Sequence, residues 1–400
     1  MYISGFKALS DFHMDFGFLN ILIGENSCGK STILQAMDFM RAFAVRDIDE
    51  YLNERGWLFE DIIPNNIYDE IKTNNNELVY KINITALFRL NVNGILKEIS
   101  WSFNVFKLSG TIYTEEAFTD KENDSIIFAR DHIDYATHDY VKGFTFKSSF
   151  MKMIDINKPS DKVPQALYSI KKFLSESSSL ELISPDKIRE KKRPNDPFYE
   201  IGIYGNRLMD YINNMSAEKQ KELNTVISKI IGYQIEMNIN RDATGLIDIN
   251  LNELFGEDKF EIKSKHISDG LLRILALTAL SLETGKSGYL LIDEIEDGIN
   301  PYLIELIINM LRESTLKNGR QVVITTHSPI VLDYSKNDEA TFMWRDHKGK
   351  INAKKLFSSE NMKNILVNFN PGEVWLNYSK NEILELIRSP NNEVNNDTNG

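Results

Sequence analysis

Residues 24–31 near the start of the chain have the types and spacing that hold a phosphate group. They read Gly-Glu-Asn-Ser-Cys-Gly-Lys-Ser and fit the pattern G-x-x-x-x-G-K-[ST] without a mismatch. Gly24 and Gly29 allow backbone angles that let successive N–H groups turn inward around an anion. Lys30 adds a cation for terminal phosphates, and Ser31 adds a hydroxyl for Mg²⁺. The alternative is a glycine-rich turn that binds nothing.

A strand before this loop and a helix after it are needed to position it. The apolar run Phe18–Ile23 predicts the strand, and apolar residues at helical spacing predict a helix to about Phe43. The start of a helix carries a partial positive charge, so this helix directs that end at the loop. The context makes nucleotide binding the stronger interpretation.

A second strand end carries acidic residues. Residues 289–293, Tyr-Leu-Leu-Ile-Asp, predict a buried strand that places Asp293 at its tip, followed by Glu294. Asp293 can hold the water shell of Mg²⁺, and Glu294 can orient or deprotonate an attacking water. Alone, the pattern is also typical of a core strand that runs into an acidic loop.

A third strand end carries a histidine. The predicted strand Gln321–Thr325 leads to His327, and a helix at 302–316, capped by Asn300, precedes the strand. A histidine at such a place is more often structural than catalytic. The strand–helix–strand spacing, however, predicts that Glu294 and His327 lie on neighbouring strand tips of one parallel sheet.

A second candidate anion site opens the predicted helix Leu271–Glu283. The preceding residues are His-Ile-Ser-Asp-Gly, in which Ser268 is a good N-cap and Gly270 keeps the helix start accessible. Taken alone, an ordinary capped helix is the simpler interpretation. Lys30 and Asp293 are 263 residues apart. This separation indicates an ATPase head built from both ends of the chain rather than a compact GTPase or kinase.

Composition limits the function classes. The 400 residues are 42% hydrophobic and 26% charged, with a net charge of −12, so any contact with nucleic acid must be local. Cys28 is the only cysteine, which excludes an internal disulfide and suits a reducing cytoplasm. No signal peptide is expected, and the longest apolar run, Leu271–Leu282, is too short to cross a membrane.

The chain divides into four predicted parts. Residues 1–149 form the first half of a head, with a β-hairpin of Leu78–Leu90 and Ile95–Leu108. Residues 150–235 have helical periodicity at Gln165–Ser175 and Ala217–Ile231 and predict a mainly helical insertion. Residues 236–388 form the second half of the head, and the Asn-rich residues 389–400 are expected to be a disordered tail.

Four segments, GENSCGKST, ISDGLLRIL, YLLIDEIEDGINP and TTHSP, resemble the ABC-type ATPases of the SMC/RecF/OLD branch. The similarity is strongest to ATPase subunits of bacterial anti-phage defence systems such as Septu and PARIS, and it covers residues 1–45 and 260–335 well. It implies an α/β P-loop NTPase fold with an ABC-type head. Such a head has a mixed β-sheet with flanking helices, an antiparallel β-subdomain and a mainly helical insertion.

The resemblance also implies roles for individual residues. The family forms a nucleotide-sandwich dimer, in which the signature motif of one subunit completes the ATP site of the other. The nucleotide-binding loop would be Gly24, Glu25, Asn26, Ser27, Cys28, Gly29, Lys30, Ser31 and Thr32, and the signature motif Ser268, Asp269 and Gly270. Ser31 and Asp293 would bind Mg²⁺, and Lys30, Glu294 and His327 would be catalytic. Residues 297–301 match the loop that contacts the second subunit, and Lys7 matches a basic residue near the phosphates.

Several positions depart from the family pattern. The signature is Ser-Asp-Gly, unlike the Ser-Gly-Gly-Gln of transporters, which favours the SMC/RecF side. Asn300 stands where a histidine is frequent. No glutamine is assigned to the Q-loop, because Gln35 lies within the predicted loop helix. Only 73 residues follow His327, too few for the TOPRIM nuclease domain of OLD-type proteins.

Three functions remain open on the sequence. The first is a cytoplasmic ATPase, dimeric or of higher order, that senses a trigger or scaffolds a separate nuclease or toxin. The second is a DNA-repair clamp that binds DNA through the basic stretches Lys187–Arg193 and Lys348–Lys355. The third, a transporter ATPase, is disfavoured by the signature motif.

Overall fold

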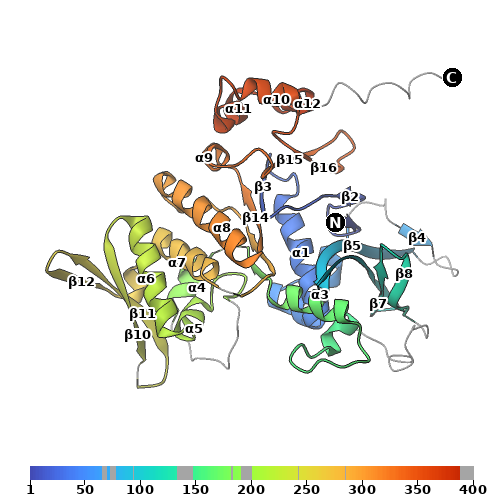
Figure 1. The fold of residues 1–400 in the computed structure, drawn as a ribbon, viewed down its shortest axis with the longest axis horizontal. Helices are drawn as coiled ribbons and strands as arrows, with labels where there is room; N and C mark the ends of the chain where they lie inside the picture. The colour runs from blue at the N-terminus through green and yellow to red at the C-terminus, as the bar shows by residue number, and fades with distance from the viewer. Residues whose placement is uncertain are drawn as a thin grey trace.

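The computed structural model describes residues 1–64, 70–72, 78–92, 94–132, 147–181, 183–190, 201–241, 243–283 and 285–387. The tail predicted at 389–400 lies outside these residues. A parallel sheet occupies the centre of the molecule, with an antiparallel sheet on one side and a helical lobe on the other (Figure 1). The fold is therefore the α/β head with a mixed sheet and an antiparallel β-subdomain that the sequence predicts.

The central sheet has the order β16-β15-β3-β14-β13-β9, in which only β16 runs antiparallel. Its strands are β3 (Leu19–Gly24), β9 (Ser178–Leu180), β13 (Tyr289–Ile292), β14 (Gln321–Thr326), β15 (Ala340–Arg345) and β16 (Ile351–Lys355). Every residue of β3 and β13 is buried, as expected for parallel strands covered on both faces. Adjacent residues face opposite cores: Leu22 packs in one and Ile21 in the other.

Aromatic residues fill the core between the central sheet and the antiparallel sheet. The antiparallel strands are β1 (Tyr2–Ser4), β2 (Phe12–His13), β4 (Glu70–Lys72), β5 (Leu78–Val92), β6 (Ile95–Leu108), β7 (Thr111–Asp120) and β8 (Ser125–Arg130). Helices α1 (Lys30–Val45), α2 (Ile48–Arg55) and α3 (Gln165–Ser175) complete this side. The ring of Phe43 stacks on Trp101 and Phe103, with centroids 5.9 and 4.3 Å apart, which joins α1 to β6.

The opposite side holds a helical lobe with a three-stranded sheet, β10-β11-β12 (Figure 1). Its elements are α4 (Pro185–Arg189), α5 (Leu208–Asn213), α6 (Ala217–Ile231), β10 (Gln234–Arg241), β11 (Ile247–Phe255), β12 (Asp258–Ile262), α7 (Asp269–Ser281) and α8 (Ile304–Asn318). Four C-terminal helices cover the β15 end of the sheet: α9 (Pro329–Asp333), α10 (Glu360–Ile365), α11 (Pro371–Asn377) and α12 (Lys380–Ile387).

One expectation about the middle of the chain needs correction. Residues 150–235, predicted as a mainly helical insertion, also contribute to the head, because β9 pairs in parallel with β13 and forms an edge of the central sheet. Helix α3, from the same segment, packs against α1. The helical part that extends away from the sheet begins only after β9. The remaining domain boundaries stay a prediction.

Candidate active site

The phosphate loop, residues 24–32, connects β3 to α1 in a conformation that requires its glycines. Gly29 precedes the helix at φ +98°, a left-handed angle that favours glycine. A Cβ at Gly24 would lie 2.2 Å from the Met343 carbonyl oxygen, and one at Gly29 would lie 2.4 Å from Ile351 Cδ1. Strands β15 and β16 therefore pack against the loop and restrict its conformation. The sequence motif alone does not indicate this contact.

The Lys30 ammonium is held over this loop by main-chain oxygens. Its Nζ donates to the carbonyl oxygens of Gly24 at 2.9 Å and Glu25 at 3.1 Å, and the residue is only 5% exposed. Burial lowers the pKa of Lys30, and the nearby negative charges of Asp293 and Glu294 oppose that shift. The Lys30 ammonium is thus close enough to interact with the charges of Asp293 and Glu294, the two acids predicted from the sequence.

Those acids lie at the tip of β13, next to the tip of β14. The strands pair in parallel with Ile292 opposite Ile324, so the predicted position of Glu294 and His327 at the ends of neighbouring parallel strands is confirmed. Thr325 Oγ1 donates to Asp293 Oδ1 and accepts the Glu294 N–H at 2.8 Å. Asp293 Oδ2 has no partner among the described residues, which fits a carboxylate that binds a hydrated Mg²⁺.

Glu294 and Glu296 differ in whether their carboxylates have hydrogen-bond partners in the described part of the chain. Glu296 accepts the His327 N–H at 2.6 Å and the Thr326 hydroxyl at 2.8 Å, so it holds the histidine turn in place. Glu294 has a left-handed φ of +48° and an exposed side chain, without a hydrogen-bond or ion-pair partner in the described part of the chain. It is therefore the carboxylate that can reach a water molecule.

His327 lies half-buried at the same edge. Burial, followed by the Lys30 charge, lowers the pKa of His327 below its usual value. This shift favours the neutral imidazole, which can accept a proton or a hydrogen bond through one ring nitrogen.

A fourth strand tip was missed by sequence reasoning. The Asp293 N–H donates to the Leu180 carbonyl of β9 at 3.1 Å, and Glu181 follows directly. Glu181 forms an ion pair with Arg55 and accepts a hydrogen bond from Gln35 Nε2 at 3.4 Å. Burial raises the pKa of Glu181 to about 7, against the opposing charge of Arg55. The segment Ser178–Leu180 is too short and too polar to signal a strand.

Lys7 contacts this group rather than the phosphate loop. Its Nζ donates to Gln35 Oε1 at 2.8 Å and lies 3.6 Å from the centroid of the Trp57 ring. Gln35, which the sequence left unassigned, thus links Lys7 to Glu181.

The signature residues Ser268, Asp269 and Gly270 open α7 in the helical lobe. Ser268 Oγ accepts the Leu271 N–H at 3.3 Å, as expected for an N-cap, and both Ser268 and Asp269 are exposed. A Cβ at Gly270 would lie 2.6 Å from the Gly298 carbonyl, so this helix start packs closely against the 297–301 loop. Within the described residues, no hydrogen bond or ion pair joins residues 268–270 to the phosphate loop.

The loop before α8 has one cap and one exposed ring. Asn300 Oδ1 accepts the Tyr302 N–H at 3.1 Å, so Asn300 is a capping residue as predicted, but of the 3₁₀ turn Pro301–Leu303 that leads into α8. Tyr302 itself is 91% exposed.

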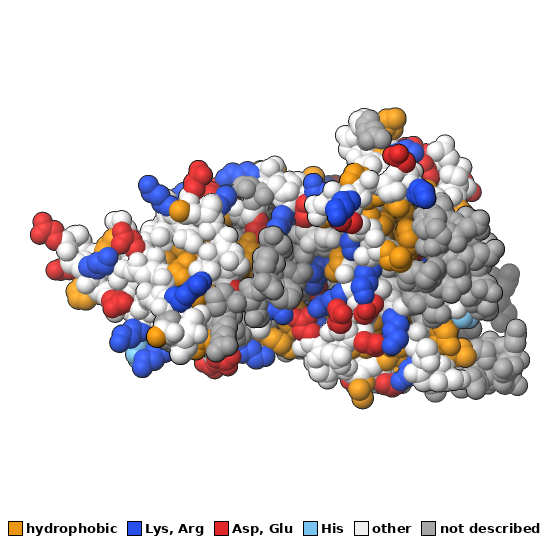
Figure 2. Space-filling model, turned by 90° about the horizontal axis from the view of Figure 1, so that it is seen from below, with side chains coloured by type: hydrophobic (Ala, Val, Ile, Leu, Met, Phe, Trp, Pro, Cys, Tyr) orange, Lys and Arg blue, Asp and Glu red, His pale blue; other side chains and the backbone are white. Residues whose placement is uncertain are grey.

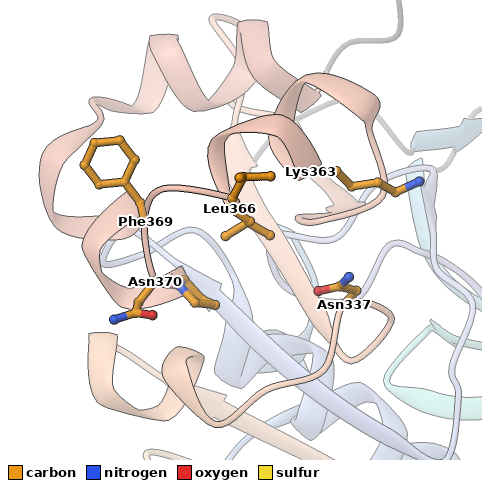
Figure 3. A pocket seen from close by; sticks show the side chains of 7 residues that line it. Asn337, Lys363, Leu366, Phe369 and Asn370 are labelled. Carbon is orange, nitrogen blue, oxygen red and sulfur yellow. The ribbon is translucent and has the colours of Figure 1, made fainter.

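A hollow of about 320 Å³ lies away from these motifs, between α10 and α11 (Figure 3). Asn337, Lys363, Leu366, Phe369 and Asn370 line it, and it contains no residue that the sequence assigned to the site. The candidate catalytic residues lie at the carboxyl ends of the parallel strands rather than in this hollow.

In the described part of the two basic stretches, Lys187, Arg189 and Lys350 have partners within the chain, the last with Asp11 at 2.6 Å. Lys187 Nζ lies 3.5 Å from the centroid of the Tyr204 ring, and Arg189 pairs with Asp186 and Asp269. Residues 191–193 fall outside the described residues. Figure 2 shows positive and negative side chains interspersed on one face of the molecule. On the described part of this face, the pattern gives little support to a continuous nucleic-acid track.

The fold and these strand tips define a P-loop ATPase head. Residues 19–333 match the family described as "AAA domain, putative AbiEii toxin, Type IV TA system", and the chain belongs to this family. The comparison with curated proteins returns no match. Among the described helices, none combines the length and the apolar character that crossing a bilayer requires.

Solved structures with a similar fold include heads of SMC proteins. One is an SMC head bound to the C-winged helix domain of ScpA, with 13% identity and a TM-score of 0.52 over 90% of this chain and 98% of that chain. An SMC head domain from Thermotoga maritima has 14% identity and a TM-score of 0.41 over 88% and 97% of the two chains. A head with an extended coiled coil, bound to a ScpA domain derived from Pyrococcus furiosus, has 12% identity and a TM-score of 0.48 over 92% and 97%. At these identities the likeness concerns the fold.

Proposed function

We propose that the protein binds and hydrolyses ATP in an Mg²⁺-dependent reaction. The observation that carries this proposal is the meeting of Lys30, Asp293, Glu294 and His327 at one edge of a parallel sheet. The Lys30 ammonium bonds to the carbonyl oxygens of Gly24 and Glu25, and it is the cation that would bind the terminal phosphate oxygens of ATP.

Each remaining residue has one task in this scheme. Glu294 orients the attacking water and accepts its proton, and the neutral His327 hydrogen-bonds the terminal phosphate. Ser31 and Asp293 would hold Mg²⁺, which would supply positive charge beside the phosphates.

We further propose that two copies of the chain share each ATP. The exposed start of α7 is then the part of the site that the second copy supplies, with Ser268 and the free helix N–H groups directed at the terminal phosphate. This arrangement supports a homodimer, or a higher homo-oligomer, that closes around ATP.

The biological role that we favour is a cytoplasmic sensor or scaffold in an anti-phage defence system, which controls a separate nuclease or toxin. The resemblance of the four motifs to Septu and PARIS ATPases supports this role, and the family description names a toxin of a toxin–antitoxin system. The alternative is a RecF/SMC-like clamp that binds DNA directly. The DNA clamp is the weaker candidate, because Lys187 contacts the Tyr204 ring and Arg189 pairs with Asp269 within the chain.

Glu294→Gln tests the reaction. The amide keeps the shape of the side chain but cannot accept the proton, so we expect turnover to fall about 10²–10⁴-fold while ATP affinity stays within threefold. Steady-state phosphate release and fluorescent-nucleotide titration measure the two quantities. Glu305→Gln, an exposed glutamate in the first turn of α8, is the matched control. Normal turnover in Glu294→Gln would show that another group activates the water.

A further inference from the structure

Arg189 makes two contacts to the signature loop that no motif assigns. Its Nη2 donates to the Ile267 carbonyl at 2.7 Å and forms an ion pair with the Asp269 carboxylate. Its Nη1 reaches Asp186 at 3.2 Å, but Asp186 is 97% exposed. The Arg189 side chain is 19% exposed, whereas that of Asp269 is 62% exposed. The mostly buried Arg189 guanidinium therefore forms an ion pair with the exposed Asp269 carboxylate.

We propose that Arg189 is a positioning residue that prepares the start of α7 to receive a phosphate. This inference rests on the proposed function, because it assigns Ser268 and the first turn of α7 to the ATP site of the partner copy. Arg189 acts through Asp269 and the Ile267 carbonyl, and it does not itself contact the nucleotide.

The electrostatic part of the argument concerns Asp269. A carboxylate in the first turn of a helix is favoured by the helix dipole, but it stands where a phosphate must approach. Two negative groups at one helix start repel each other unless a cation lies close to one of them. The Arg189 guanidinium supplies that cation, so the first turn keeps its attraction for an anion.

The geometric part concerns the loop before the helix. Ile267 and Ser268 are extended, and the Arg189 bond to the Ile267 carbonyl fixes the residue directly before the N-cap. Helix α4, which carries Arg189, packs against α7 and follows the β9 tip by a few residues. The orientation of Ser268 is therefore set by a segment that begins beside Asp293.

A purely structural ion pair would have different consequences. If Arg189 served only to stabilise the lobe, its loss would lower the unfolding temperature without changing catalysis per folded molecule. If it neutralises Asp269, its loss acts on the shared site, and removal of the Asp269 charge compensates for it. The two cases separate in a double-mutant cycle.

The experiment compares Arg189→Gln, Arg189→Lys, Asp269→Asn and the double variant Arg189→Gln/Asp269→Asn, each as the full chain. For each variant we measure ATP affinity of dilute monomer, kcat and KM for hydrolysis, and ATP-dependent dimerisation in a Glu294→Gln background by light scattering. Arg312→Gln is the control, because the Arg312 side chain on α8 is buried to a similar extent as that of Arg189 and forms an ion pair with Glu339 at 2.7 Å.

For Arg189→Gln we expect unchanged ATP affinity in the monomer, a kcat at least tenfold lower and a correspondingly weaker dimer. Arg189→Lys keeps the charge and stays within about threefold of the wild type. The double variant recovers most of the lost kcat. Arg312→Gln lowers only the unfolding temperature.

Two results overturn the inference: wild-type kcat in folded Arg189→Gln, or a double variant as slow as Arg189→Gln. Should Arg189→Gln not fold, a tenfold loss of kcat in folded Arg189→Lys would also contradict it. A wild-type protein that neither hydrolyses ATP nor dimerises would contradict the proposed function itself. The two failures are therefore distinguishable.

Discussion

The starts of α1 and α7 are both candidate phosphate-binding positions, but they differ in how far each is enclosed and in that only α7 has a capping side chain. The α1 start is packed by β15 and β16, and its Lys30 is almost fully buried. The α7 start is exposed at Ser268 and Asp269 and is held chiefly by Arg189 and the 297–301 loop. In the proposed function the first binds phosphate within one chain, whereas the second binds it only together with the phosphate loop of a second copy. We expect their variants to fail in correspondingly different ways.

The largest effect is expected for Lys30→Ala. Removal of the Lys30 ammonium, which we propose binds the terminal phosphates, should raise the Kd for ATP at least about 100-fold, since charge-assisted bonds contribute about 1.5–3 kcal/mol each. Isothermal titration with ATP measures it. Lys380→Ala is the matched control, because Lys380 pairs with Glu25 of the same loop at 3.4 Å. Unchanged affinity in Lys30→Ala would count against this loop as the nucleotide site.

The next largest effect separates the two helix starts. Ser268→Arg should bind ATP normally in its own phosphate loop, yet fail to hydrolyse it, because the bulky cation blocks the shared face. Mixed with Lys30→Ala, it should regain part of the activity, since one of the two composite sites then has an intact loop and an intact signature. Heterodimer formation must first be verified by pull-down of differently tagged chains. Normal hydrolysis by Ser268→Arg alone would refute the assignment of Ser268.

A smaller change sharpens the same comparison. Ser268 and Ser216 are both exposed N-cap serines whose Oγ accepts a backbone N–H at 3.3 Å. Replacement of either by alanine should lower the unfolding free energy by about 0.5–2 kcal/mol. Only Ser268→Ala should also reduce kcat. Equal kcat values for the two variants would indicate that Ser268 acts only as a helix cap.

The smallest effect concerns pH and Glu181 beside Asp293. Burial raises the pKa of Glu181 to about 7 in the folded chain, above its unfolded value. Between these two values the folded state holds more protons, so the Glu181 contribution to stability falls as pH rises toward 7 and is lost above it. Relative to Glu181→Gln, the wild type should therefore lose unfolding free energy between pH 5 and 7.5. Urea unfolding at both pH values measures this, and a constant difference would contradict it.

The parts of the site that were predictable are those with local signals. The phosphate loop is a contiguous motif, and the neighbouring tips of β13 and β14 follow from one strand–helix–strand unit. The Asn300 cap is equally local. Each of these needs only a few tens of residues of sequence to be recognised.

The remaining features depend on contacts between distant residues. Strand β9 has three residues with no apolar alternation, and only its pairing with β13 makes it a strand. Arg55 meets Glu181 across 126 positions, and Arg189 meets Asp269 across 80. Sequence periodicity carries no information on such pairs, and a basic stretch such as 187–193 looks the same whether its cations are free or paired.

The sheet order has a consequence for the way the chain is made. Strand β3 emerges early from the ribosome, yet it lies between β14 and β15, with Ile21 opposite both Ile324 and Ala340. The antiparallel strands find neighbours nearby in the chain, so they can pair during synthesis, whereas closing a loop of some three hundred residues is slow. Until then β3 and the apolar face of α1 have no complete core and are exposed to aggregation. A nascent chain that ends before residue 340 thus contains the whole phosphate motif but lacks the strand that holds it in shape.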